Sequence, residues 1–264
     1  DGGTIKLDGN YPVGANNVAL GDTALDSNAS GSENTAIGSG ALTAATASEL
    51  TAVGYRALAS NTSGSRNVAV GRLAAYSTTT GGSSVSLGTG AGYSNTSGGY
   101  NTAIGDLALF ANSTASNNTA VGYKASYTNT TGHSNAIVGY TAGYFNTTGT
   151  DLSALGMGAL FKNTTGQYNT AIGRSALLNN TTASNNTAVG YQAGYSNTTG
   201  QYNTFVGKSA GYTSNVAAGR NTFVGMNAGY YVSSGDSNTI LGRYNGNEGG
   251  LDIRTSSNNI VLSD

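Results

Sequence analysis

Apolar and polar positions repeat along this chain with a period of 17 residues. Each copy opens on the phrase Asn-Thr-Ala-(Ile/Val)-Gly or a close variant, and the closing glycines of fourteen copies run from Gly21 to Gly242. The spacing between these glycines is 17 residues throughout, except for one step of 16 after Gly38 and one of 18 after Gly207. A short fixed period is typical of a solenoid, in which each unit packs only against its neighbours.

We number each unit from its first Asn, with residues 186–202 as the type copy. Seventeen residues are too few for two helices, but they suit two short strands and two turns. Position four is apolar in every copy, from Leu20 to Leu241, and position two holds Thr or Val in most copies. Since alternate residues of a strand share one face, we predict that positions two and four form the core. The fold class expected is an all-β parallel β-solenoid (β-roll) of about 14 coils.

Other positions of the unit are almost as regular. Position eight is Ala in thirteen consecutive copies, which indicates a tight clearance between neighbouring segments. Position ten is Tyr or Phe in most copies, interrupted by Leu178, and predicts a stacked aromatic column. Position twelve is mostly Asn and position fifteen mostly Gly, as turns require. The Asn at position one is expected to hydrogen-bond with its copies along the solenoid axis.

Position three lies on the face opposite the predicted core. It forms an apolar stripe of small residues that gives way to larger ones, and its main members are Ala103, Ala120, Ala171, Ala188, Phe205 and Phe223. Monomers rarely leave such a stripe in contact with water. We therefore expect it to be covered by the same stripe on identical chains. The alternative is that the second strand of each coil folds over this face within one chain.

The repeat also defines the expected domain limits. Residues 1–15 precede the first regular copy and are expected to form an N-terminal lead-in strand or cap. Residues 16–242 form the solenoid, and residues 243–264 break the phase and are expected to form a C-terminal cap or outgoing strand.

Charge and composition exclude several partners. The formal net charge is −1, and the 11 Lys and Arg residues are scattered singly, so no basic stripe is present to bind nucleic acid. No apolar run approaches the roughly 20 residues of a membrane-spanning helix, so we expect no membrane insertion. The chain contains no cysteine, which fits both oxidising and reducing compartments.

Chemistry-bearing residues are sparse. His133, the single histidine, occupies the variable position sixteen, where we expect an exposed turn residue rather than a general base. Asp106, Asp151 and Asp236 are isolated from one another, and the turns lack the Asp of calcium-binding β-rolls. We therefore predict no enzyme activity, no catalytic residues, no metal site and no cofactor.

Two surface features have alternative interpretations. Asn61, Asn95, Asn129, Asn146, Asn163 and Asn197 each begin an Asn-x-Ser/Thr sequon. Glycosylation is one interpretation of them, and turn chemistry alone is the favoured one. Exposed tyrosines at position six are candidates for binding a cell-surface glycan or protein, namely Tyr55, Tyr123, Tyr140 and Tyr191. Stacking that stiffens the solenoid is the simpler interpretation of these rings.

The repeat resembles two known kinds of sequence. Residues 67–74 and 101–108 are similar to head repeats of trimeric autotransporter adhesins, whose chains form left-handed parallel β-rolls packed as trimers. The longer unit at residues 186–200 looks still more like repeats of bacteriophage tail-fibre proteins. The resemblance spans residues 16–242, although the adhesin repeat is shorter than 17 residues. It implies a left-handed homotrimer outside the cell, in a virion tail fibre or on a cell surface.

The function expected from these features is a structural and adhesive fibre segment, a phage tail-fibre shaft or head that supports attachment to the host surface. The alternative is a self-assembling extracellular microbial filament or surface adhesin, in which solenoids join end to end. A third candidate is ice binding, suggested by the Thr column at position two. It ranks last because that column shares the face of the predicted core.

Overall fold

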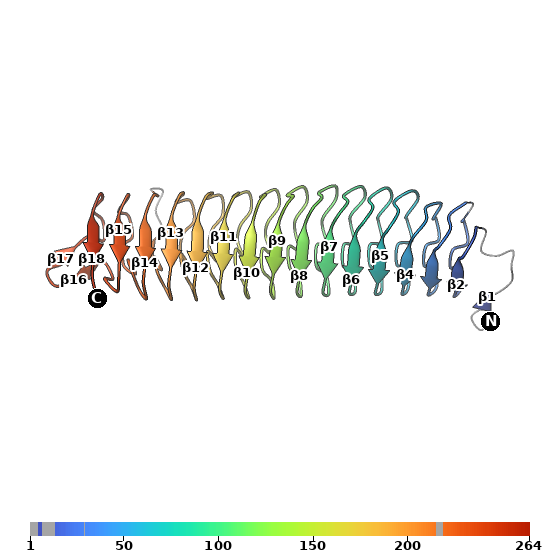
Figure 1. Ribbon diagram of the computed structural model, residues 1–264, viewed down its shortest axis with the longest axis horizontal. Coiled ribbons are helices and arrows are strands. Elements are labelled where there is room, and N and C mark those ends of the chain that lie inside the picture. Colours follow the sequence, from blue (N-terminus) through green and yellow to red (C-terminus); the bar gives the residue numbers. More distant parts are fainter. Residues whose placement is uncertain (1–4, 7–13, 29, 215–218) are drawn as a thin grey trace. The chain divides into compact units, whose positions relative to one another are not determined.

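The computed structural model describes residues 5–6, 14–28, 30–214 and 219–264 (Figure 1). The chain divides into two compact units, residues 1–133 and residues 134–264, which are described separately. Each unit contains seven coils of about 17 residues, and each coil contributes one three-residue strand to a parallel sheet. The predicted fold class, a parallel β-solenoid of about 14 coils, is therefore confirmed.

Eight strands lie in the described residues of the first unit. These are β1 (Ile5–Lys6), β2 (Val18–Leu20), β3 (Thr35–Ile37), β4 (Thr51–Val53), β5 (Val68–Val70), β6 (Val85–Leu87), β7 (Thr102–Ile104) and β8 (Thr119–Val121). Strands β2 to β8 pair in parallel with identical repeat positions opposite each other, as in Ala103 with Ala120. Strand β1 pairs antiparallel with β2 and occupies its outer edge. The rest of the predicted lead-in, residues 1–4 and 7–13, lies outside the described residues.

In the second unit, the part of the chain that the structure describes forms ten strands. These are β9 (Ala136–Val138), β10 (Ser153–Leu155), β11 (Thr170–Ile172), β12 (Thr187–Val189), β13 (Thr204–Val206), β14 (Thr222–Val224), β15 (Thr239–Leu241), β16 (Asn247–Glu248), β17 (Leu251–Asp252) and β18 (Ile260–Leu262). Strands β9 to β15 pair in parallel and in register, and β18 continues this ladder beside β15. The short antiparallel pair β16 and β17 lies between them in sequence.

The second strand predicted for each coil is replaced by a turn segment. In the coil that follows β11, Gly173, Ser175 and Leu177 have φ values of 127°, 57° and 48°. An extended strand needs negative φ throughout, so this alternation breaks it. The inter-coil ladder nevertheless continues, because the Leu177 N–H donates to the carbonyl of Ala193 at 3.0 Å. Each coil is thus hydrogen-bonded to the next well beyond its strand.

The predicted core face is wrong. Position three points into the coil, where Ala171 and Ala188 are fully buried, whereas Ile172 at position four is 38% exposed. The turn segment folds over position three and places its own Ala176 and Leu177 against it, both fully buried. The face is therefore covered within one chain, as in the alternative, but by a turn segment and not by the predicted second strand. A small residue is needed at position three where position nine carries Leu, because the two segments approach closely across a thin coil.

Volumes at positions three and nine compensate each other. Where position three is Ala171, position nine is Leu177, and both are fully buried. Where position three is Phe205, position nine is Gly211. A Cβ added to Gly211 would lie 2.4 Å from two ring carbons of Phe205, so the ring occupies the space that Leu fills in other coils. The two pairs thus fill the same interior space with different residues.

Two structural constraints require glycine at the end of each repeat phrase. Gly105 has a φ of 128°, a conformation that side-chain-bearing residues rarely adopt. A Cβ on Gly105 would also lie 2.6 Å from the carbonyl oxygen of Gly122 in the next coil. Close stacking of the coils therefore explains why all fourteen copies keep this residue.

Buried asparagines form two ladders along each unit. At position twelve, Nδ2 of Asn180 donates to Oδ1 of Asn163 at 2.8 Å, and Nδ2 of Asn163 donates to Oδ1 of Asn146 at 2.8 Å. At position one, the backbone N–H of Asn186 donates to Oδ1 of Asn169 at 2.9 Å. Nδ2 of Asn186 donates to the Gly200 carbonyl at 2.9 Å. The axial bonding predicted for position one is present, mostly through backbone groups, and the continuous amide chain lies at position twelve.

The position-twelve ladder also decides between the two interpretations of the sequons. The six sequon asparagines are all buried, and their Nδ2 atoms carry the hydrogen bonds of the turn, as Asn163 does to the Gly166 carbonyl at 3.0 Å. A glycan on that nitrogen is incompatible with the folded coil. Turn chemistry therefore accounts for the sequons.

Candidate interaction surfaces

The outward face of the strands is the largest regular surface of each unit. It consists of positions two and four, and we call it the strand face. Its aliphatic file is more than a third exposed at Leu20, Ile37, Val70 and Ile104 in the first unit and at Leu155, Ile172 and Leu241 in the second. Neither position carries a charged residue in any of the fourteen copies. A contiguous apolar file of this kind differs from the scattered single exposed residues that are normal on proteins.

The stripe predicted to mediate oligomerisation is not on the surface. Its six members, Ala103, Ala120, Ala171, Ala188, Phe205 and Phe223, are at most 1% exposed within the single chain. They contact the turn segment of their own coil and cannot contact another molecule. The stripe is buried because position three, and not position four, faces the interior. Any self-association would therefore have to use the strand face.

The four candidate tyrosines at position six border the strand face. Tyr55, Tyr123, Tyr140 and Tyr191 are all exposed, and Tyr140 is the most exposed of them at 56%. Cations lie over two of the rings at close range. The Arg56 guanidinium carbon is 5.3 Å from the ring centre of Tyr55, and Lys124 Nζ is 5.2 Å from that of Tyr123. These contacts hold the rings at the surface and are worth about 0.5–1 kcal/mol at exposed sites.

The predicted aromatic column is confirmed at position ten. In the first unit, Tyr76, Tyr93, Phe110 and Tyr127 stack with centroid distances of 5.3, 5.0 and 5.2 Å. In the second unit, Tyr195, Tyr212 and Tyr230 stack at 4.9 Å. Burial raises the pKa of Tyr212 above its ordinary value of 10.0, and the neighbouring rings of Tyr230, Tyr195 and Tyr191 raise it further. The neutral phenol is thus favoured, and its contribution to stability is complete below the unfolded pKa and is lost as pH rises through the raised folded pKa.

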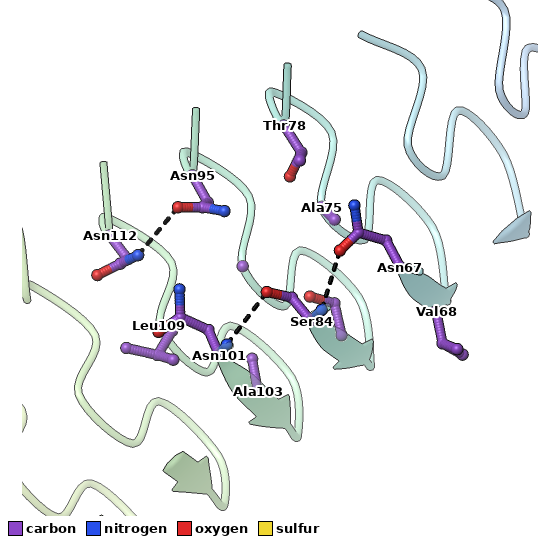
Figure 2. Close-up of a pocket in the computed structure, with 12 residues that line it drawn as sticks. Asn67, Val68, Ala75, Thr78, Ser84, Asn95, Asn101, Ala103, Leu109 and Asn112 are labelled. Atoms are coloured by element: carbon purple, nitrogen blue, oxygen red, sulfur yellow. Dashed lines mark hydrogen bonds between the residues drawn. The ribbon is translucent and has the colours of Figure 1, made fainter. Parts of the chain in front are cut away.

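An interior cavity of about 10 Å³ marks an irregular coil in the first unit (Figure 2). This coil carries Ser84, Ser86 and Gly92 at positions one, three and nine, so all three interior residues are small. Figure 2 shows Ser84 between Asn67 and Asn101, with Oδ1 of Asn67 accepting from the Ser84 N–H at 3.0 Å. The space is on the order of one water molecule, too small for a substrate. The cavity is therefore a packing irregularity.

The same region interrupts the position-twelve ladder. Thr78 stands where an Asn would link Asn61 to Asn95, and Oδ1 of Asn61 is buried with no hydrogen-bond partner among the described residues.

We expect Thr78→Asn to stabilise the first unit by about 1–2 kcal/mol, since its amide would satisfy that oxygen. Urea unfolding followed by circular dichroism measures the change. Thr80→Asn in the exposed part of the same turn is the matched control and should change stability by less than about 0.5 kcal/mol. Equal effects of the two substitutions would contradict the account of the ladder.

Ionisable side chains do not gather into a site in the described parts of the chain. His133 lies exposed in its turn, as predicted, and Asp106 and Asp151 are also exposed. A search of the described residues finds no group of three or more His, Cys, Asp or Glu side chains that could hold a metal ion. The described residues also contain no helix long and apolar enough to cross a membrane.

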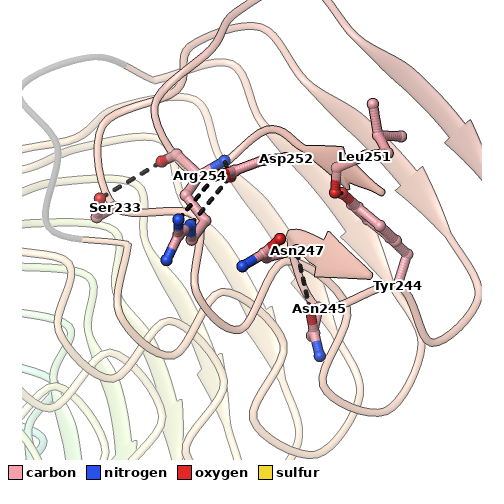
Figure 3. A network of polar contacts seen from close by, with 7 residues as sticks. All are labelled: Ser233, Tyr244, Asn245, Asn247, Leu251, Asp252 and Arg254. Atoms are coloured by element: carbon pink, nitrogen blue, oxygen red, sulfur yellow. Dashed lines mark hydrogen bonds and ion pairs between the residues drawn. The ribbon is translucent and has the colours of Figure 1, made fainter. Parts of the chain in front are cut away.

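Residues 243–264 cover the C-terminal end of the second unit (Figure 3). Ile253 is almost fully buried, and the Tyr244 hydroxyl donates to the Leu251 carbonyl at 2.6 Å. Figure 3 shows Arg254 folded onto Asp252, with Nη2 to Oδ2 at 2.7 Å and Nε to Oδ1 at 3.0 Å. These bonds hold the segment as a compact end piece beside β15.

The hydrogen bonds from Arg254 lower the pKa of Asp252 from 3.8 to about 2. Because the folded pKa lies below the unfolded value, the stabilising contribution is complete above the unfolded value and is lost as pH falls through about 2. We expect an NMR titration to place the Asp252 carboxyl near that value. Arg254→Gln should return it towards 3.8. A titration midpoint that is the same in both proteins would contradict the ion pair.

No protein-family model, curated protein or solved structure matches this chain. Its own geometry shows a β-solenoid repeat protein of about 14 turns.

Proposed function

We propose that this chain is a structural and adhesive segment of an extracellular fibre, built from identical chains that associate through the strand face. The observation that carries the proposal is the uncharged aliphatic file, more than a third exposed at four coils of the first unit and three coils of the second. Water contact with such a file is costly, at roughly 25 cal/mol per Å² of apolar surface. A second copy of the chain offers a matching file with the same spacing between coils.

The fold supports a mechanical role. Backbone bonds, two Asn ladders and an aromatic stack all run from coil to coil, so each unit resists local opening along its length. The repeats resemble those of phage tail fibres and of trimeric adhesin heads, and a left-handed homotrimer in a virion tail fibre or on a cell surface is the assembly we propose. Attachment to a host-surface glycan or protein would then be supported by the fibre, with no catalysis.

The runner-up is an end-to-end extracellular filament. Strand β1 pairs antiparallel with β2 and occupies the edge at which another coil would have to add. Strand β1 is then the edge strand, and its length of two residues offers few free backbone groups, which discourages growth by strand addition. This pairing favours side-by-side association over indefinite threads.

Native mass spectrometry tests the proposal. A trimer has three times the chain mass of 26.3 kDa, or about 79 kDa, and persists at micromolar concentration. We expect the double variant Ile172→Lys/Val206→Lys to be monomeric, since it places charges in the strand face. The control Thr165→Lys/Thr182→Lys adds the same charge to exposed turns and should remain trimeric. A monomeric natural chain would overturn self-association, and a ladder of growing masses would favour the filament.

Ice binding gains support from one observation. Its low rank depended on the Thr column lying on the core side, and the structure turns that column outward. Five consecutive strands, β11 to β15, align Thr170, Thr187, Thr204, Thr222 and Thr239 in register. Such hydroxyls repeat at about 4.8 Å, the spacing of neighbouring strands. Thermal hysteresis that is lost in Thr187→Lys/Thr204→Lys would favour this function, and none in the natural chain would exclude it.

A further inference from the structure

A surface hollow of about 270 Å³ opens on the second unit beside the aromatic column. Three consecutive coils place small residues at position seven, namely Thr141, Gly158 and Ser175. In the same stretch Leu178 replaces the aromatic residue of position ten. A Cβ added to Gly158 would come no nearer than 3.8 Å to Leu178 and 3.9 Å to Ser175, so space is open above it. Local departures from the repeat, and not the repeat itself, create this hollow.

The lining combines apolar surface with hydroxyl groups. The hollow is bordered by Tyr140 and Met157, which are 56% and 41% exposed, and by the partly exposed ring of Phe161. Thr141 and Ser175 add hydroxyls. Aromatic and thioether side chains pack well against the flat face of a ring, while hydroxyls bond to its polar edge. The volume is just below the roughly 300 Å³ at which drug-sized pockets begin, so it suits a single six-membered ring.

Charge narrows the choice of ligand. Of the eight described residues that line the hollow, Lys162 is the one with a charged side chain, and it is exposed. An ammonium group beside an apolar floor favours a ligand that carries an anion, because charge-assisted hydrogen bonds to carboxylates are the stronger kind. We propose that this hollow binds a pyranose ring that carries a carboxylate, with the ring against Met157 and Phe161 and the carboxylate paired with Lys162.

The proposal goes beyond the fibre role and does not require self-association, because all eight residues belong to one chain and one unit. It assigns Tyr140 alone, of the four candidate tyrosines, to a ligand site. The other three stand outside the hollow.

Saturation-transfer NMR with methyl glucuronide as the probe, and methyl glucoside as its uncharged partner, tests the site. Gly158→Leu is the blocking variant. The fold accepts Leu at this position, since Leu73 and Leu107 occupy position seven in the first unit with φ values of 57°, close to the 65° of Gly158. We expect the variant to weaken glucuronide binding by at least about tenfold. Gly40→Leu, at position seven of the first unit, should bind as the natural chain does.

Lys162→Gln separates the charge from the ring contacts. We expect it to weaken glucuronide binding about tenfold while leaving glucoside binding unchanged. Natural protein that binds the two probes equally, or fails to bind glucuronide, would overturn the proposal, and so would full binding by Gly158→Leu. Native mass spectra of the same samples should show an unchanged assembly, so failure of this site is distinguishable from failure of the proposed fibre.

Discussion

Phe205→Ala is expected to destabilise the second unit by about 3–5 kcal/mol, because it empties a fully buried ring position. Gly211→Leu is expected to destabilise it as well, since even a Cβ would lie 2.4 Å from the Phe205 ring. The double variant Phe205→Ala/Gly211→Leu recreates the Ala and Leu pair found at Ala171 and Leu177. We expect it to recover most of the loss. Urea unfolding of the four proteins gives the coupling between the two sites.

Comparing the two single variants with the double variant separates the effect of interior volume from the effect of each substitution alone. An interaction energy above about 2 kcal/mol indicates that positions three and nine share one space. Two losses that simply add would contradict that claim. Repeat proteins can unfold in stages, so the transition should be followed with probes in both units.

Removal of one rung of the position-twelve ladder is expected to be almost as damaging. Asn163→Leu keeps a similar volume, but Asn180 loses the acceptor of its 2.8 Å bond. Oδ1 of Asn146 and the Gly166 carbonyl lose the donor of their 2.8 Å and 3.0 Å bonds. Each buried group left unsatisfied costs about 1–3 kcal/mol, so we expect a loss of about 3–5 kcal/mol. Denaturation midpoints measured by circular dichroism provide the test.

Thr165→Leu is the control for this substitution, because Thr165 is exposed in the same turn. It should change stability by less than about 1 kcal/mol. If Asn163→Leu were equally mild, the ladder would be a consequence of packing and not a source of stability.

Much of the fold follows from the sequence. The 17-residue period gives the coil count, the Asn and Gly positions give the turns, and the aromatic recurrence gives the stacks at Tyr93 and Tyr212. These features depend on local chemistry repeated in register, which one chain displays fourteen times. A regular period therefore determines the arrangement even where each single copy is ambiguous.

The sequence did not correctly predict which face of each strand is interior, and the reason is physical. Hydrophobicity alone places Ile172 inside and leaves Ala171 outside, yet with Leu177 at position nine this coil has room only for the smaller side chain. A signal was present in the sequence. Ala171 accompanies Leu177 and Phe205 accompanies Gly211, and such size compensation indicates that positions three and nine pack together. The opposite face then lies outside, and the proposed interaction surface moves with it.

The surface hollow was also missed, because it arises where the repeat fails. The run of small residues at position seven and the leucine that interrupts the aromatic column both mark it in the sequence. Their proximity becomes visible only when neighbouring coils are stacked. Departures from a repeat are thus the places to search for ligand sites in such chains.

One comparison tests the central claim, that position three is interior and position four faces outward. Ala171→Asp and Ile172→Asp place the same carboxylate on adjacent residues of β11, and far-UV circular dichroism with thermal unfolding reports on each. We expect Ala171→Asp to abolish the cooperative transition of its unit, because an unpaired carboxylate would be buried, while Ile172→Asp remains a folded solenoid. A folded Ala171→Asp together with an unfolded Ile172→Asp would contradict the account.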